Sequence, residues 1–284
     1  MNIETVNQLI ASSQPQSRLW RGPTLILLGL SILLGAVWAD PGLLPLNGST
    51  SWMLPQCLLL AIFVLIIHDA IRQRRADQLM QAVFEAVQLQ QWAQARESLS
   101  LLLRSPIRRP MARTQSLLAL AAVTDADHEY EASQRIYEHI LEEGHASPIQ
   151  QHTAQVALGA TMLRTGQTTD AVTLIDRLIL QDLPDPLRAQ VELLALFREV
   201  VMGHTHESIS RAEDRATMFR THLGTRAGYG YALLAAAFER ANQPDTARRY
   251  WRDATLLVPV KELVDRFSEL EPIANRYPAV EYPL

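Results

Sequence analysis

The residues of this chain best suited to chemistry are its histidines. Two pairs stand close together in the sequence, His204 with His206 and His139 with His145. Imidazole is a common metal ligand, but neither pair belongs to a convergent pattern of cysteines or carboxylates. We therefore interpret them as surface histidines and expect no metal site and no cofactor.

The sequence carries no phosphate-binding loop and no GxGxxG, GxSxG or HExxH motif. Its single cysteine, Cys57, lies in an apolar run and cannot form an intrachain disulfide. The net charge of −4 and the pI of about 6.1 provide no bulk positive charge for nucleic acid. We therefore expect a protein that is not an enzyme and does not bind nucleic acid.

A local basic cluster is the remaining polar feature, and it falls in a predicted connection between helices. Its members are Arg104, Arg108, Arg109 and Arg113. Two interpretations stay open: a solvated connector near anionic lipid headgroups, or a docking patch for an acidic partner.

Two apolar runs near the start of the chain predict on which side of a membrane these groups lie. The runs cover residues 23–39 and 53–67, and the connection between them contains no Lys or Arg. Basic residues flank the pair on both outer sides. The positive-inside rule therefore predicts two membrane spans, at about 23–39 and 52–70. The segment 1–22 and everything after 70 are then cytoplasmic, and the loop 40–51 is periplasmic.

Three details of this membrane segment leave alternatives. Residues 37–39 before Asp40 resemble a signal-peptide cleavage site, so the first run is either a span or a cleaved leader. Ile3, Val6 and Ile10 share one helical face, which suits either a helix lying on the membrane or a frayed terminus. Residues 72–76 contain no Gly or Pro, so the second span can continue as one helix into the following domain.

From about residue 76 the chain repeats a pattern of paired helices. The clearest unit has Tyr231, Leu234, Ala235 and Phe238 on a first helix, a turn at 242–244, and Ala247 with Trp251 on a second. A small residue recurs on each second helix with spacings of 37, 39, 37 and 39, at Ala95, Ala132, Ala171, Ser208 and Ala247.

In residue type and spacing this pattern resembles the tetratricopeptide repeat. The resemblance implies an all-α fold, in which a solenoid of about five helical hairpins covers residues 71–259. A helix over 261–274 would cap its end, followed by an extended tail to 284. The residues expected to define repeat packing are Ala95, Ala132, Gly159, Ala171, Ala235, Phe238, Ala247 and Trp251.

Proteins of this family usually bind a peptide or helix in a concave groove lined by their first helices. Mapping that groove onto this chain gives mostly small and apolar positions, which suit an amphipathic helix. The family's clamp for acidic C-termini is not expected, because its Lys and Asn positions hold Met80, Phe84, Thr153 and Ala157. The mapped groove residues are Thr153, Val156, Ala160, Leu163, Arg164, Tyr229, Ala232, Ala236, Glu239 and Arg240.

The order of parts, two spans followed by cytoplasmic repeats, is similar to that of HemY-type inner-membrane proteins. Basic residues are almost all Arg, which suggests a GC-rich bacterial genome. The sequence thus favours a scaffold or adaptor in a bacterial inner membrane, with partners recruited to an envelope-associated complex. The alternative is an assembly factor or holdase for membrane-protein clients.

Overall fold

A computed structural model of the chain describes residues 1–14, 63, 64, 67, 71, 74, 75, 77–87, 89, 91–107 and 109–277. Every regular element in these ranges is a helix, so the predicted all-α class is confirmed. The loop 40–51, the cleavage site at 39 and most of both predicted spans lie outside these ranges. Among the described residues, no helix has the length and apolar character needed to cross a membrane.

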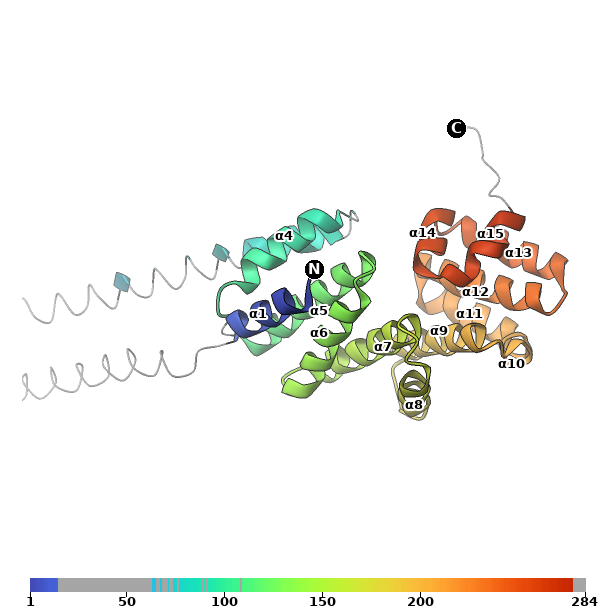
Figure 1. Cartoon of the computed structure of the whole chain (residues 1–284), viewed down its shortest axis with the longest axis horizontal. Helices are drawn as coiled ribbons and strands as arrows, with labels where there is room; N and C mark the ends of the chain where they lie inside the picture. Colours follow the sequence, from blue (N-terminus) through green and yellow to red (C-terminus); the bar gives the residue numbers. More distant parts are fainter. Residues whose placement is uncertain are drawn as a thin grey trace, which may run out of the picture. The chain divides into compact units, whose positions relative to one another are not determined.

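The chain divides into two compact units. The N-terminal unit (residues 4–119) contains α1 (Ile3–Ser13), helical residues up to 87, α4 (Trp92–Leu103) and the start of α5 (Pro110–Ala126). The C-terminal unit comprises residues 1–3 and 120–284. Its helices follow in chain order (Figure 1): α6 (Tyr130–Glu143), α7 (Pro148–Arg164), α8 (Thr168–Ile179), α9 (Asp185–Met202), α10 (Thr205–Ser210), α11 (Ala212–His222), η1 (Gly224–Arg226), α12 (Ala227–Arg240), α13 (Pro244–Thr255), α14 (Val260–Arg266), η2 (Ser268–Leu270) and α15 (Glu271–Arg276).

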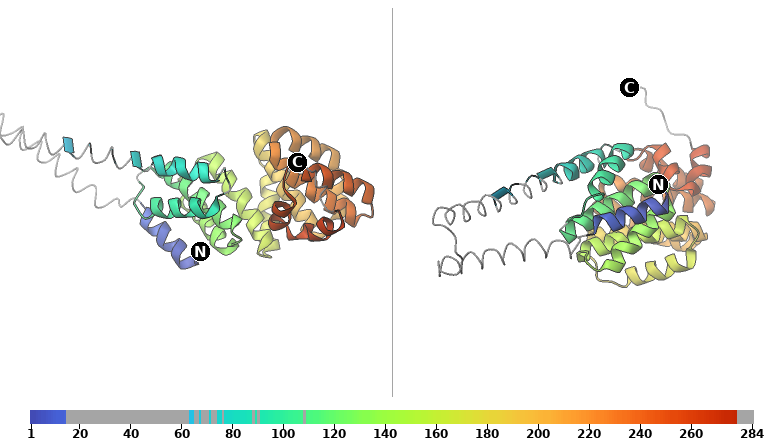
Figure 2. Two further views of the ribbon diagram at one scale, coloured as in Figure 1. Left: turned by 90° about the horizontal axis from the view of Figure 1, so that it is seen from above. Right: turned by 60° about the vertical axis from the view of Figure 1, so that its left-hand side comes forward.

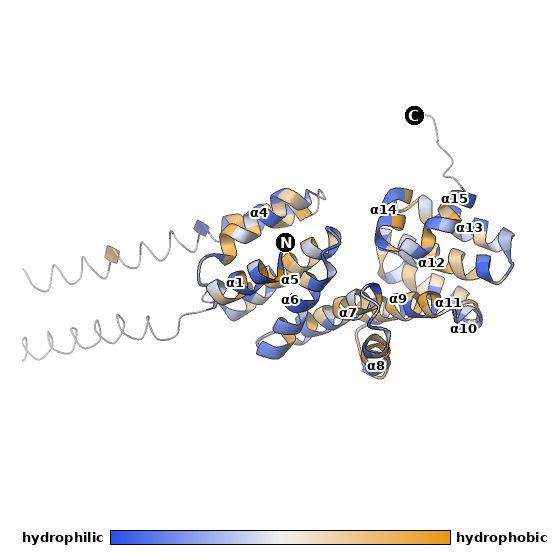
Figure 3. Ribbon diagram, in the orientation of Figure 1, coloured by the Kyte–Doolittle hydropathy of each residue, from blue (hydrophilic) through white to orange (hydrophobic). Residues whose placement is uncertain are grey.

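Helices in the C-terminal unit pack mainly against their neighbours in sequence. Helix α7 contacts α6, α8 and α9, while α12 contacts α9 and α13. The orange and red helices α12 to α15 stay together in both views of Figure 2. Hydrophobic and hydrophilic residues alternate along most helices (Figure 3), as expected where each helix buries one face. The protein is therefore a stack of helices with sequential pair contacts.

One backbone turn recurs five times along the described chain. In each copy an amide N–H donates to the carbonyl five residues earlier, at 2.8–3.0 Å. The donor residue then begins the next helix as its N-cap, with φ between −78° and −115° and ψ between 56° and 67°. These residues are Gln91, Glu129, Gln167, His204 and Gln243, at spacings of 38, 38, 37 and 39. Equal turns at near-equal spacing make a structural repeat.

A left-handed residue precedes four of these N-caps and ends the first helix of the pair. Gly166 and Gly203 take φ of +76° and Asn242 takes +57°, conformations that glycine and asparagine adopt at low cost. The fourth is His128, at φ +62°. Residues other than glycine seldom adopt this conformation, and no glycine or asparagine marks this turn in the sequence.

Four residues after each N-cap lies a small residue with no exposed surface. The five are Ala95, Ser133, Ala171, Ser208 and Ala247. They are the small residues that the sequence pattern singled out, except that Ser133 takes the place assigned to Ala132. On the first helix of the third pair, a methyl group at Gly159 would meet Leu194 at 3.0 Å. Small residues at these points allow helix backbones to approach closely.

The C-terminal cap differs from the single helix predicted over 261–274. The chain breaks at Phe267, which is extended at φ −135° and ψ 97°. Pro272 sits in the first turn of α15. Since proline has no N–H and its ring clashes with the carbonyl four residues earlier, one helix cannot run through this point. The break turns Phe267, Leu270 and Ile273 into the core.

Helix α1 is a packed element of the N-terminal unit, which differs from both interpretations of this segment. Val6, Leu9 and Ile10 are buried. Arg113 donates from Nε to the Ser13 hydroxyl at 3.0 Å and from Nη2 to the Ile10 carbonyl at 3.1 Å. Arg113 is itself 3% exposed, so it does not belong to a surface basic cluster.

We expect Gly230→Ala to lower the free energy of unfolding by about 1–3 kcal/mol. A methyl group on Gly230 would lie 2.2 Å from Cδ2 of Phe219, which is fully buried. The gain in helix propensity, about 1 kcal/mol, opposes this loss. Urea unfolding followed by circular dichroism measures the change. The double variant Gly230→Ala/Phe219→Leu should recover part of the lost stability. An absence of recovery would contradict the proposed clash.

Candidate functional site

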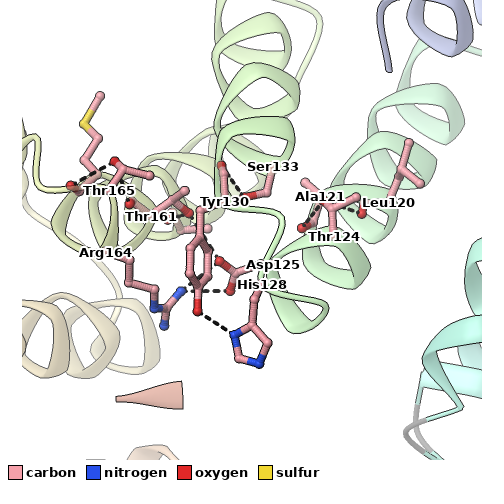
Figure 4. A network of polar contacts seen from close by, with 12 residues as sticks. Leu120, Ala121, Thr124, Asp125, His128, Tyr130, Ser133, Thr161, Arg164 and Thr165 are labelled. Atoms are coloured by element: carbon pink, nitrogen blue, oxygen red, sulfur yellow. Dashed lines mark hydrogen bonds and ion pairs between the residues drawn. The ribbon is translucent and has the colours of Figure 1, made fainter. Parts of the chain in front are cut away.

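Arg164 lies at the centre of a polar network in the C-terminal unit (Figure 4). It is the last residue of α7, and its Nη1 donates to both carboxylate oxygens of Asp125, at 2.8 and 2.9 Å. Thr161 donates to the same carboxylate at 3.4 Å. The Arg164 side chain is 8% exposed and that of Asp125 is 15% exposed. This shielded ion pair joins the end of α5 to the end of α7.

Aromatic rings surround the same guanidinium. Its carbon lies 5.4 Å from the centroid of Tyr130 and 5.9 Å from those of Phe197 and Phe267. These distances are within the range of a cation–π interaction. The Nε–H of Arg164 is buried and has no acceptor among the described residues. Arg164 thus keeps an unused donor although its charge is balanced by Asp125.

A second arginine approaches the other members of this group. Arg266 ends α14, and its guanidinium carbon lies 4.9 Å from the Tyr229 ring and 5.9 Å from the Phe267 ring. Arg266 is exposed and pairs with no carboxylate of the described chain. Although the Arg266 side chain reaches solvent, surrounding protein atoms desolvate its guanidinium, and this desolvation together with the charge of Arg164 lowers the pKa of Arg266. We call the six residues Tyr130, Arg164, Phe197, Tyr229, Arg266 and Phe267 the arginine–aromatic cluster.

Polar groups at the edge of the cluster come from the turn between α5 and α6. The ring Nδ1 of His128 lies 2.7 Å from the Tyr130 hydroxyl (Figure 4). Burial is the main cause of a raised pKa for Tyr130. Burial raises the pKa of Tyr137 strongly too. Both hydroxyls therefore stay protonated at neutral pH and do not act as bases.

The predicted groove residues of the third repeat lie along α7. Thr153 is exposed, while Val156 and Ala160 are partly exposed. Arg164 belongs to the cluster described above. Its substitution by Glu, an obvious test of a groove, would place a second carboxylate against Asp125 and so destabilise the fold.

The predicted groove residues of the fifth repeat are covered by the chain itself. Ala232 and Ala236 are 0% and 4% exposed, and Tyr229 donates to a carboxylate oxygen of Glu262. Glu239 accepts a hydrogen bond from the Tyr277 hydroxyl at 2.8 Å and pairs with Arg276. Helix α15 and η2 contact α12 directly. The C-terminal segment therefore occupies this part of the mapped groove.

Arg240 serves a different purpose from the one its groove position suggested. Its Nη1 donates to the backbone carbonyl of Val200, near the end of α9. This bond adds a second donor to a carbonyl in the last turn of α9, which also accepts from the Gly203 amide at 3.3 Å. Arg240 therefore joins α12 to α9.

Sequence reasoning missed Arg266 and Phe267. Both lie in the predicted capping helix over 261–274, and neither is among the residues predicted for the groove or for repeat packing. Only the break at Phe267 brings this ring to 4.8 Å from Phe197. No local pattern in the sequence indicates that contact.

The histidines are distributed differently from the surface arrangement expected. His204 and His206 are exposed, but His139 is buried and its Nε2 lies 3.2 Å from Glu143. Within the ranges that the structure describes, no three His, Cys, Asp or Glu side chains are grouped to hold a metal ion.

Three comparisons with known proteins found no counterpart. No family model matches the sequence, no curated protein matches it, and no solved structure matches it.

We expect stability to fall between pH 10 and pH 12 in a way that depends on Tyr229. Burial, followed by the hydrogen bond to Glu262, raises the pKa of Tyr229 to about 12. An unfolded tyrosine ionises near pH 10, so the unfolded state loses its proton first as the pH rises. The raised pKa of Tyr229 therefore stabilises the folded state fully below pH 10, and this stabilisation is lost by pH 12. It amounts to about 2–3 kcal/mol.

Urea unfolding at pH 9, 10, 11 and 12 measures this loss. Tyr229→Phe retains the ring and removes the ionising group, so its stability should decline less over the same range. Equal declines in the variant and the natural chain would show that other groups cause the alkaline loss.

Proposed function

We propose that this chain is a membrane-anchored scaffold of the tetratricopeptide type that binds protein partners on the cytoplasmic face of a bacterial inner membrane. The five recurring helix turns carry the proposal. Repeats of paired helices expose extended surfaces that bind other proteins. The arginine–aromatic cluster in the C-terminal unit is built of Arg, Tyr and Phe, which are residues enriched in protein interfaces.

The packing of α1 supports two membrane crossings. The hydroxyl of Ser12 donates to the Leu103 carbonyl at 2.9 Å, and the Ile107 amide donates to the Ser13 carbonyl at 3.2 Å. In the sequence after the apolar runs, the Met80 sulfur accepts a hydrogen bond from the Ser116 hydroxyl at 3.3 Å. Residues 13 and 80 thus belong to one compact unit. A chain that leaves a folded unit and returns to it crosses a bilayer an even number of times.

Exposed apolar side chains support contact with lipid. Phe63, Val64, Ile67 and Ile71 are 61%, 56%, 41% and 46% exposed. Exposed apolar residues gathered in one segment indicate an interaction surface. All four are helical. Phe63, Val64 and Ile67 lie in the second apolar run, and Ile71 follows it. We infer that the helix of the second span continues into the first repeat.

The topology is tested with single cysteines in a Cys57→Ser background. Gln8→Cys, Ser49→Cys and Asp182→Cys report on the terminus, the connection between the apolar runs and the C-terminal unit. A membrane-impermeant maleimide should label only position 49 in intact spheroplasts, and all three after lysis. Labelling of position 8 or 182 before lysis would contradict the proposed orientation.

Partner binding is tested by crosslinking in cells, mild detergent extraction and quantitative mass spectrometry. A scaffold should capture one or two proteins at near-unit stoichiometry. A broad set of substoichiometric membrane proteins would instead favour the assembly factor. An open apolar groove would suit that alternative, but the C-terminal segment contacts the mapped groove residues Tyr229 and Glu239.

A further inference from the structure

The arginine–aromatic cluster contains more hydrogen-bond donors than acceptors. Arg164 uses Nη1 on Asp125, while its buried Nε has no acceptor among the described residues. Arg266 lies over the Tyr229 and Phe267 rings and makes no hydrogen bond or ion pair in the described chain. A guanidinium has five N–H donors, so Arg266 offers an almost unused set.

We propose that Arg266, next to Arg164, recognises a carboxylate on an acidic peptide segment of the partner protein. This inference rests on the proposed scaffold function and names the chemistry of its partner. The planar guanidinium matches a carboxylate through two parallel hydrogen bonds. Stacking on Tyr229 restricts its orientation before binding, which reduces the entropy lost when the ligand arrives.

The charges around Arg266 favour a single carboxylate over a polyanionic surface. Arg164 and Arg226 lie within electrostatic range of Arg266, as does Asp125. Glu262 and Glu269 act on Tyr229 and Tyr130 in the same cluster. Three arginines and three carboxylates leave no net positive field. Membrane surfaces and nucleic acids bind to several uncompensated cations, and this cluster does not provide them.

The carboxylates near Arg266 leave it available. Asp125 is engaged by Arg164, and one oxygen of Glu262 accepts from the Tyr229 hydroxyl. His128 is exposed beside Tyr130, where it offers a ring nitrogen at the edge of the cluster. An acidic peptide, unlike a free anion, has backbone amides and carbonyls that can pair with this edge.

The test uses the full chain in dodecyl maltoside and the fluorescein-labelled peptide Ala-Glu-Ala-Ala-Glu-Ala with an amidated end. Fluorescence anisotropy should show binding of this peptide and weaker binding of the matched Gln peptide. Arg266→Gln should weaken binding about tenfold, because a charge-assisted hydrogen bond is lost. Arg266→Lys keeps the charge but not the planar pair of donors. Its affinity for the Glu peptide should lie between those of the natural chain and Arg266→Gln.

Arg220→Gln is the matched control, since Arg220 is an exposed arginine of α11 that makes no ion pair in the described chain. Equal affinities for Arg266→Gln and Arg220→Gln would overturn the proposal. Binding of short-chain phosphatidylglycerol that requires Arg266, together with no binding of the Glu peptide, would overturn it too. Unchanged circular dichroism of each variant establishes that the fold is intact.

Crosslinking separates the failure of this inference from that of the scaffold function. If the natural chain and Arg266→Gln capture the same partner equally, the carboxylate site is wrong and the scaffold stands. If the natural chain captures no partner in stoichiometric amount, the scaffold proposal itself fails.

Discussion

Arg215→Ala should lower the free energy of unfolding by about 3–5 kcal/mol, the cost of leaving a buried charge without its partner. Arg215 on α11 is 2% exposed and donates to Glu199 at 2.6 and 2.7 Å. It also donates to Glu192 at 3.3 Å, and both carboxylates belong to α9. Burial opposes the charge on Arg215, but the hydrogen bond and charge of Glu199 outweigh it and raise the pKa of Arg215.

The measurement is urea unfolding followed by circular dichroism. Arg249→Ala is the matched control, because Arg249 pairs with Glu213 at 3.4 Å while both side chains are more than half exposed. Exposed pairs contribute about 0–1 kcal/mol, so this variant should change little. The double variant Arg215→Met/Glu199→Met should recover much of the loss, since it removes both charges. Equal effects of Arg215→Ala and Arg249→Ala would contradict the role of the buried network.

Trp251→Ala should cost about 3–5 kcal/mol and loosen the C-terminal segment. Trp251 on α13 is 2% exposed, and its indole Nε1 donates to the Tyr277 carbonyl at 2.7 Å. The substitution leaves a large cavity and an unsatisfied carbonyl. Urea unfolding gives the global loss, while hydrogen exchange of residues 260–277 reports on the segment.

Trp251→Phe separates the two contributions, because it fills most of the space but cannot donate the hydrogen bond. We expect a loss of about 1–2 kcal/mol from the missing bond and residual space. If both Trp251 variants lose the same stability, packing is not the main contribution. If exchange in 260–277 is unchanged by Trp251→Ala, the residue does not hold the segment.

The paired helices could be predicted because their signals are local. Apolar residues at helical spacing identify a buried face, and Gly166 or Asn242 marks a turn that requires a left-handed residue. Where the turn residue was His128, no such signal existed, and the pattern chose Ala132 in place of Ser133. A shift of one residue is small in sequence but rotates a helix face by about 100°.

The charged contacts could not be predicted, since they depend on side chains far apart in the chain. Arg164 meets Asp125 across 39 residues, and Arg113 meets Ser13 across 100. In sequence, both arginines look like residues of an exposed face or connector. Their partners become visible only when the helices are packed.

The sequence by itself determined that this protein is built from helices, where most of the helix pairs turn, and that two apolar runs precede them. These features follow from local propensity and from the period of apolar residues. The tertiary structure decided that α1 packs into the N-terminal unit and that the C-terminal segment contacts the mapped groove residues Tyr229 and Glu239 of α12. It also placed Arg266 beside Arg164. Such outcomes depend on which buried faces meet, and a pattern along one helix does not contain that information.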